Sequence, residues 1–102
     1  MAQTEAVVST KTRKGLKEPS MFKVIYINDN TTTADFVIGS LMEFFGYSEE
    51  TAANLTIDIH EQGSASVAVL PYEIAEQKGT EVTQYARSQN MPLQIKLEPD
   101  NG

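Results

Sequence analysis

Residues 22–30 read Phe-Lys-Val-Ile-Tyr-Ile-Asn-Asp-Asn. The first six are mostly β-branched or aromatic, which is typical of a strand. Three small polar residues then end the apolar run, and the pattern becomes helical near Phe36. A polar segment between a strand and a helix is a favourable place for a binding site, because both elements fix its geometry. It is equally typical of a plain turn, since Asn and Asp are common turn residues, and spacing alone favours the turn.

The rest of the chain predicts two more strands and three helices. Thr32 is expected to cap the first helix, with Asp35 three residues later in a weak form of the capping box. Gly46 and Gly63 are expected to end the first and second helices, because glycine often follows a last turn. The expected elements are a strand over 21–27, helices over about 32–45 and 48–62, a strand over 64–70, a helix over about 71–89 and a strand over about 93–97. This β-α-α-β-α-β order predicts an α+β fold, a two-layer domain with a three-stranded sheet and three helices on one face.

Side-chain periodicity predicts which faces of these elements are buried. Residues 93–97 alternate apolar and polar, as in a strand with one buried face. Gly79, in the middle of the third helix, predicts a bend or a close contact, because glycine there costs about 1 kcal/mol against alanine. The expected core faces of the second and third helices are Ala52, Leu55 and Ile59, and Ile74, Lys78, Val82, Tyr85 and Ala86.

Composition and charge exclude several classes of function. The chain has 102 residues, no cysteine and one histidine, which excludes disulfides, thiol catalysis and a His-rich metal site. No cofactor or metal is expected. The net charge is −6, and residues 1–20 hold four basic and two acidic residues, so residues 21–102 carry −8. We therefore expect a flexible tail over residues 1–20 and one acidic domain over residues 21–102 that binds neither nucleic acid nor a membrane.

No catalytic motif accompanies the candidate polar residues. The chain has neither a nucleophile elbow nor a Gly-rich phosphate loop. His60 lies one helical turn after Thr56, beside the apolar stripe of the second helix. A lone histidine in such a position is more often structural than functional, and its role depends on whether this helix end meets the Asn28 turn. A small hydrolase that uses His60 stays open as an alternative, although no ordered motif supports it.

Several stretches resemble the ClpS family of small adaptors of AAA+ proteases. The resemblance is carried by Pro19 to Ile25 leading into Asn28-Asp29-Asn30, by Phe36-Val37-Ile38 through Phe44-Phe45, by His60-Glu61-Gln62-Gly63, by Tyr85-Ala86-Arg87 and by Pro92-Leu93. It covers about residues 19–98. It implies a protein that is not an enzyme, binds substrates whose N-terminal residue is bulky and hydrophobic, and delivers them to a Clp ATPase such as ClpA or ClpC.

The resemblance also implies roles for individual residues. The α-amino group of the substrate would be bound by Asn28, Asp29, Asn30 and His60. The pocket for the first side chain would be lined by Tyr26, Ile27, Thr32, Ala34, Val37, Thr56, Ile59 and Leu93. Glu73 and Lys78 match positions that dock on the ATPase, and residues 1–20 would engage the ATPase during delivery. A monomer in the cytoplasm, or in the plastid stroma, is expected.

Three positions depart from the family pattern. The family often has a second acid where Asn30 stands, and commonly has methionine where Ala34 and Thr56 stand. Two small residues in place of two large flexible ones predict a wider, more polar pocket with relaxed side-chain preference. The alternative within binding proteins is a domain like the C-terminal part of the bacterial ribosomal stalk protein. That alternative predicts a basic helix face for translation factors, whereas this domain is acidic.

Overall fold

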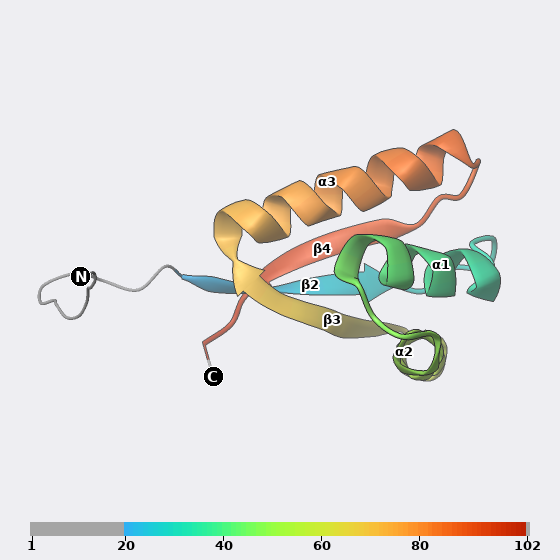
Figure 1. Ribbon diagram of the computed structural model, residues 1–102, viewed down its shortest axis with the longest axis horizontal. Helices are drawn as coiled ribbons and strands as arrows, with labels where there is room; N and C mark the ends of the chain where they lie inside the picture. Colours follow the sequence, from blue (N-terminus) through green and yellow to red (C-terminus); the bar gives the residue numbers. More distant parts are fainter. Residues whose placement is uncertain (1–19, 102) are drawn as a thin grey trace, which may run out of the picture.

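The computed structural model describes residues 20–101, so the predicted tail, apart from Ser20, lies outside the described residues. Figure 1 shows the six elements in chain order. They are β2 (Met21–Ile27), α1 (Ala34–Phe45), α2 (Glu49–Gln62), β3 (Ser64–Pro71), α3 (Tyr72–Ser88) and β4 (Gln94–Pro99). This order confirms the predicted β-α-α-β-α-β fold.

The three strands form one antiparallel sheet in the order β3-β2-β4, with β2 in the centre. Val24 lies opposite Ala68 on one side and Leu97 on the other. The pairing of β2 with β3 shifts register between Val24 and Ile25, which leaves Val67 as the extra residue of a bulge. Because β2 is central and antiparallel to β3, the end of β2 lies beside the start of β3, directly after α2.

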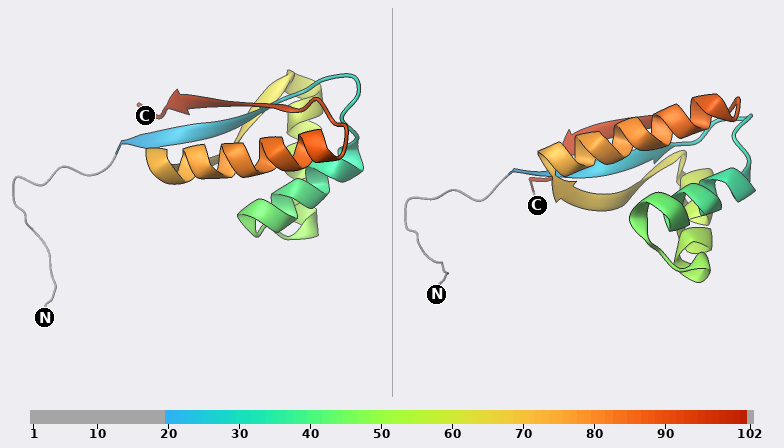
Figure 2. Two further views of the ribbon diagram at one scale, coloured as in Figure 1. Left: turned by 90° about the horizontal axis from the view of Figure 1, so that it is seen from above. Right: turned by 45° about the horizontal axis from the view of Figure 1, so that its top comes forward.

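Figure 2 shows α3 lying along the sheet as a second layer, with α1 and α2 next to each other at the end of the sheet where β2 ends. The core between these layers is formed by Val24, Tyr26, Val37, Leu41, Ala52, Ile59, Val67, Ala75, Val82, Ala86 and Leu93. The Tyr26 hydroxyl is buried in this core and hydrogen-bonds the Ser40 hydroxyl at 2.8 Å. Ser40 in turn donates to the Val37 carbonyl, so Tyr26 is the donor in their pair. Burial raises the pKa of Tyr26 to about 12, although the Ser40 hydrogen bond lowers it slightly.

Two local predictions were wrong. The N-cap of α1 is Thr33, whose hydroxyl accepts from the Phe36 NH, because the Thr32 hydroxyl is already bonded to Asp29. The buried face of α3 runs through Ala75, Val82 and Ala86, while Ile74 is 45% exposed. The prediction is confirmed for Val82 and Ala86. Tyr85, like Ile74, is exposed, and the small Ala75, which the prediction lacks, is buried.

Candidate functional site

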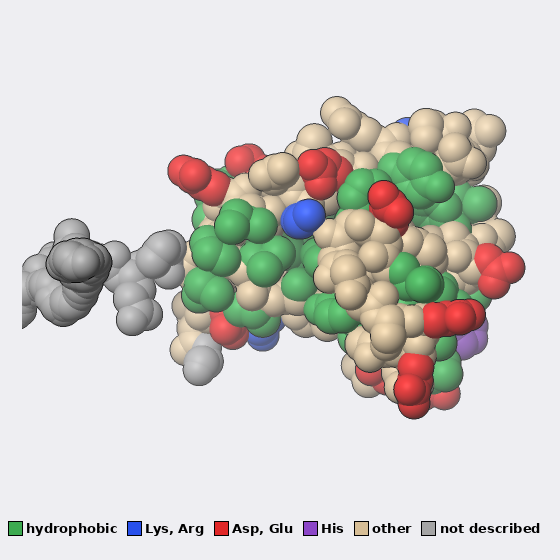
Figure 3. Space-filling model, in the orientation of Figure 1, with side chains coloured by type: hydrophobic (Ala, Val, Ile, Leu, Met, Phe, Trp, Pro, Cys, Tyr) green, Lys and Arg blue, Asp and Glu red, His purple; other side chains and the backbone are tan. Residues whose placement is uncertain are grey.

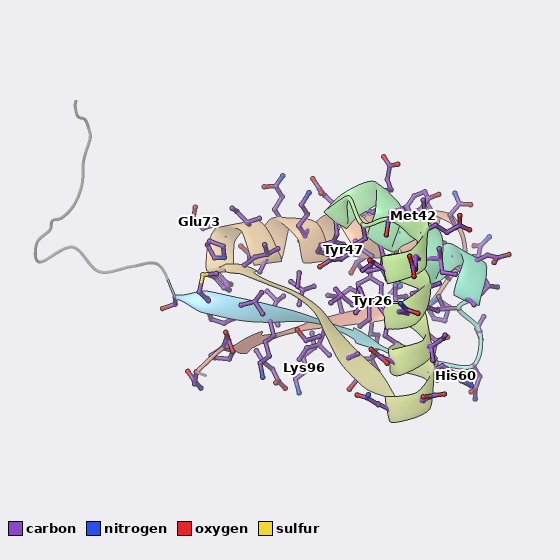
Figure 4. The ribbon with its side chains drawn as sticks, turned by 60° about the horizontal axis from the view of Figure 1, so that its bottom comes forward. Tyr26, Met42, Tyr47, His60, Glu73 and Lys96 are labelled. Carbon is purple, nitrogen blue, oxygen red and sulfur yellow. The ribbon has the colours of Figure 1, made fainter. Side chains whose placement is uncertain are left out.

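The turn after β2 is joined directly to the end of α2. The Asn28 NH donates to the Gly63 carbonyl at 2.9 Å. Gly63 is the C-cap of α2, with a left-handed φ of 87°, and its own NH donates to the Ile59 carbonyl. This backbone connection brings His60, in the last turn of α2, to the same end of the domain as Asn28. Figure 4 shows His60 on the side of α2 near the loop between β2 and α1.

Gly63→Ala is expected to lower the free energy of unfolding by about 1–2 kcal/mol, because a side chain is strained in the left-handed region. Gly39→Ala is the matched control, since Gly39 lies inside α1 with no atom near an added Cβ. That change is expected to stabilise the protein by up to about 1 kcal/mol. Urea denaturation measures both. Equal effects of the two substitutions would contradict the role assigned to Gly63.

The Asp29 carboxylate organises the turn from within. Its Oδ1 accepts from the Thr31 NH at 2.8 Å and the Thr32 NH at 2.7 Å, and its Oδ2 accepts from the Thr32 hydroxyl at 2.7 Å. Partial burial tends to raise the pKa of Asp29, but these hydrogen bonds and the positive charge of Arg87 outweigh it and lower the pKa. The carboxylate is therefore held ionised, and it fixes the backbone between Asn28 and α1.

A groove of about 700 Å³ lies between this turn and α2. Its wall combines the polar turn, the start of α1 and one side of α2. Of its apolar lining, Val37 and Ile59 are buried core residues, while Ala34 is exposed at the start of α1. The lining residues are Asn28, Asp29, Asn30, Thr32, Ala34, Val37, Thr56, Ile57, Ile59, His60 and Glu61. The structure thus brings together the four predicted amine-binding residues and five of the residues predicted for the side-chain pocket.

Three predicted pocket residues do not line this groove. Tyr26 and Leu93 are 0% and 1% exposed, and both belong to the core beneath the site. Ile27 lies next to Tyr26 in β2, and successive side chains of a strand point to opposite faces. It lines a separate hollow of about 270 Å³ with Pro92 and Gln94. In the structure these three residues therefore lie outside the groove lining.

Two residues of the groove were missed by the sequence analysis. Ile57 and Glu61 lie one turn apart on α2, immediately after Thr56 and His60 in sequence. Ile57 is 52% exposed, whereas Thr56 is 9% exposed. The sequence signal that could have identified them is their i, i+4 spacing, since each directly follows a predicted site residue, Thr56 or His60. It was overlooked because a charged residue and an isolated apolar residue on an exposed helix face are usually ordinary surface.

The groove offers unused polar groups beside an apolar wall. Within residues 20–101, the side chains of Asn28, Asn30 and His60 make no hydrogen bond. The Thr56 hydroxyl is committed, since it donates to the Ala52 carbonyl at 2.7 Å. Chemically, the arrangement suits a cationic group with several donors that is attached to an apolar group. Among the described residues, no group of three His, Asp or Glu side chains could hold a metal ion.

Comparison with known proteins identifies the family. Residues 17–96 match the family model described as ATP-dependent Clp protease adaptor protein ClpS. The chain belongs to the ClpS family. It is 44% identical over 94 residues to the ATP-dependent Clp protease adapter protein ClpS of Escherichia coli O127:H6 (strain E2348/69 / EPEC). The matched region covers 92% of this chain and 89% of that protein. The corresponding protein of Citrobacter koseri is 43% identical over the same length.

A solved ClpS structure shares the fold. Agrobacterium tumefaciens ClpS2 bound to L-phenylalaninamide matches with a TM-score of 0.79 and 35% identity, over 81% of this chain and 100% of that one. The sequence resemblance to ClpS is therefore confirmed, and the chain is an adaptor of the Clp protease system. The ribosomal-stalk alternative is not supported by these matches. None of the helices in the described part of the chain is long and apolar enough to cross a membrane.

Glu73 lies at the opposite end of the domain from His60 (Figure 4). Glu73 is exposed in the first turn of α3 and lines a hollow of about 430 Å³ with Ser20, Pro71, Tyr72 and Ile74. Lys78 is half-buried further along α3, with its Nζ 4.0 Å from Glu81. Figure 3 shows hydrophobic side chains gathered where α3 begins, with acidic side chains around them. The ClpS domain thus has two separate exposed features, one at each end.

Proposed function

We propose that this protein binds the free N-terminus of substrate proteins that begin with a bulky hydrophobic residue, and passes them to a Clp ATPase. The observation that carries the proposal is the groove, where the free polar side chains of Asn28 and His60 lie beside an apolar wall in a ClpS-family chain. The ligand of the related ClpS2 supports it. L-Phenylalaninamide carries a free α-amino group and an apolar side chain, as does the first residue of a peptide.

The amine would be held by acceptors from both sides of the groove. An ammonium group has three donors, and the Asn28 side-chain oxygen and a neutral His60 nitrogen can each accept one. A carboxylate has about four acceptor positions, and the turn uses three of those on Asp29, so Oδ2 keeps one. The Asn30 amide oxygen lies at the same turn. Neutral Asn30 supplies no charge, so the negative charges of the groove lining are those of Asp29 and Glu61.

The energies suit a transient complex. Each charge-assisted hydrogen bond contributes roughly 1.5–3 kcal/mol. Burying a Phe or Leu side chain in the groove contributes a further 1.5–3 kcal/mol, roughly. After the cost of association, affinity of about micromolar order is expected. Such affinity allows an adaptor to release its cargo to the ATPase.

The first-residue preference is expected to be broader than the usual Leu, Phe, Tyr and Trp. Ala34 and Thr56 are small, so the wild-type groove is expected to admit Ile or Val as well. Replacing both by methionine is expected to weaken binding of a Val-first peptide by roughly fivefold or more, because filling a packed site forces side chains to shift. A panel of peptides that differ only at residue one measures this by fluorescence anisotropy.

The control for these substitutions is Leu55→Met, since Leu55 is half-buried on α2 outside the groove. It is expected to leave the panel unchanged. A wild-type protein that already rejects Ile and Val would contradict the wider pocket.

The remaining roles concern delivery, and they extend the proposal. Glu73 and Lys78, with the apolar side chains at the start of α3, would dock on a ClpA- or ClpC-like ATPase. Residues 21–102 would form the adaptor domain, and residues 1–20 would engage the ATPase. The adaptor would act as a monomer without catalysis of its own, in the cytoplasm or plastid stroma.

A degradation assay tests the whole function. A fluorescent reporter that begins with Phe is incubated with a ClpA-like ATPase, its protease and ATP, with or without the adaptor. The adaptor is expected to accelerate loss of fluorescence for this reporter and not for one that begins with Ala. Equal rates for both reporters would overturn the proposed function.

A further inference from the structure

We propose that Ile57 and Glu61 form a second subsite of the groove, which contacts the second residue of the bound peptide and favours a long cationic side chain there, lysine or arginine. The inference rests on the proposed function, because the first residue must be anchored by its amine between Asn28 and His60. It adds a preference that the first-residue pocket does not explain.

The groove is larger than one side chain requires. Its volume of about 700 Å³ falls within the range of about 300–1,000 Å³ that holds drug-sized ligands. Its floor, at Val37, Thr56 and Ile59, is buried, while Ile57 is half exposed. The groove therefore has a deep part and a shallow outer part along α2. The deep part suits the first side chain, and the outer part is left for the chain that follows.

The second residue must lie close to this outer part. Consecutive Cα atoms are about 3.8 Å apart, so a peptide whose amine is held at His60 places its second residue near the adjacent positions of α2. Ile57 and Glu61 are four residues apart on α2, which corresponds to a rise of about 6 Å. A side chain that contacts both must therefore be long.

The chemistry of the two residues selects that side chain. Lysine and arginine carry an apolar stem and a charged end, so the stem can lie on Ile57 while the cation reaches Glu61. Within residues 20–101, Glu61 makes no ion pair, so its carboxylate is available. Asp29, across the groove, adds a second negative charge to the lining. Figure 3 shows acidic side chains together with the histidine around this end of the domain.

The test uses three free-amine peptides that begin with Phe and differ only at the second residue, which is lysine, norleucine or alanine. Norleucine keeps the stem of lysine without its charge. In Glu61→Gln, the ratio of lysine-peptide to norleucine-peptide affinity is expected to fall by about threefold, the size of an exposed ion pair. In Ile57→Ala, the preference for norleucine over alanine is expected to fall. Each protein substitution, combined with the matching change at the second residue of the peptide, forms a double-mutant cycle.

Asp58→Asn is the matched control, because it removes the same charge from the same helix outside the groove lining. Its lysine-to-norleucine ratio is expected to stay at the wild-type value. A ratio that Glu61→Gln and Asp58→Asn lower equally would mean a general field and would overturn the subsite. The subsite would also be overturned if neither substitution changed this ratio while free-amine peptides still bound. If no free-amine peptide binds better than its acetylated form, the proposed function fails and the subsite with it.

Discussion

His60→Ala and Asn28→Ala are each expected to weaken binding of a free-amine, Phe-first peptide by about 10- to 100-fold, which corresponds to one charge-assisted hydrogen bond. Both side chains line the groove and neither is committed to another hydrogen bond among residues 20–101. Fluorescence anisotropy measures the affinity of each variant.

Gln62→Ala and Asn54→Ala are the controls for these two changes. Both residues are exposed on α2 and lie outside the groove lining. They are expected to leave affinity within about twofold, as surface changes usually do. If His60→Ala binds as tightly as the wild type, the histidine has no part in holding the amine.

Asp29→Ala is the second substitution with a large expected effect. It is expected to lower both the stability of the fold and the affinity for the peptide. It leaves the Thr31 NH, the Thr32 NH and the Thr32 hydroxyl without their acceptor. Loss of such a capping side chain costs about 0.5–2 kcal/mol. Affinity is expected to fall about tenfold or more, because a carboxylate of the groove lining is lost and the turn that positions Asn28 loosens. Urea denaturation and anisotropy measure the two losses.

The pH dependence separates this stabilisation from a general defect. The folded-state pKa of Asp29 lies below its ordinary value of 3.8, so its stabilising contribution is fully present above that value. The contribution is lost as the pH falls through the folded-state pKa. The stability difference between wild type and Asp29→Ala is therefore expected to be constant near neutral pH and to shrink in acid.

Asp29→Asn distinguishes the two roles of this residue. The amide keeps an oxygen for the Thr31 and Thr32 NH groups but lacks the charge. It is expected to restore most of the stability and little of the affinity. If Asp29→Ala is as stable as the wild type at neutral pH, the hydrogen bonds of the turn do not contribute as described.

The elements could be predicted from the sequence because each has a strong local signal. The glycines Gly46 and Gly63 mark helix ends, and both have left-handed φ values in the structure. The cap of α1 was misplaced by one residue, since Thr32 and Thr33 are equivalent in sequence. Asp29 decides which of the two caps the helix, because its carboxylate accepts a hydrogen bond from the Thr32 hydroxyl and leaves Thr33 as the N-cap.

The candidate site needed the tertiary structure. The sequence leaves open whether His60 meets the Asn28 turn, because this depends on the pairing of β2 with β3. In the structure Ile27 lies opposite Ser64, which places Asn28 against Gly63. Resemblance to ClpS implied this, yet it could not separate a groove wall from the core behind it. The resemblance implies a place in the wall for Tyr26, and in the structure this residue is fully buried.

The central claim is tested most directly with two fluorescent peptides that begin with Phe and differ only in a free or an acetylated N-terminus. Acetylation removes the charge and two of the three donors and leaves the side chain unchanged. The free peptide is expected to bind with about micromolar affinity, and the acetylated peptide at least tenfold more weakly. Equal affinity for the two peptides would contradict an amine site in the groove.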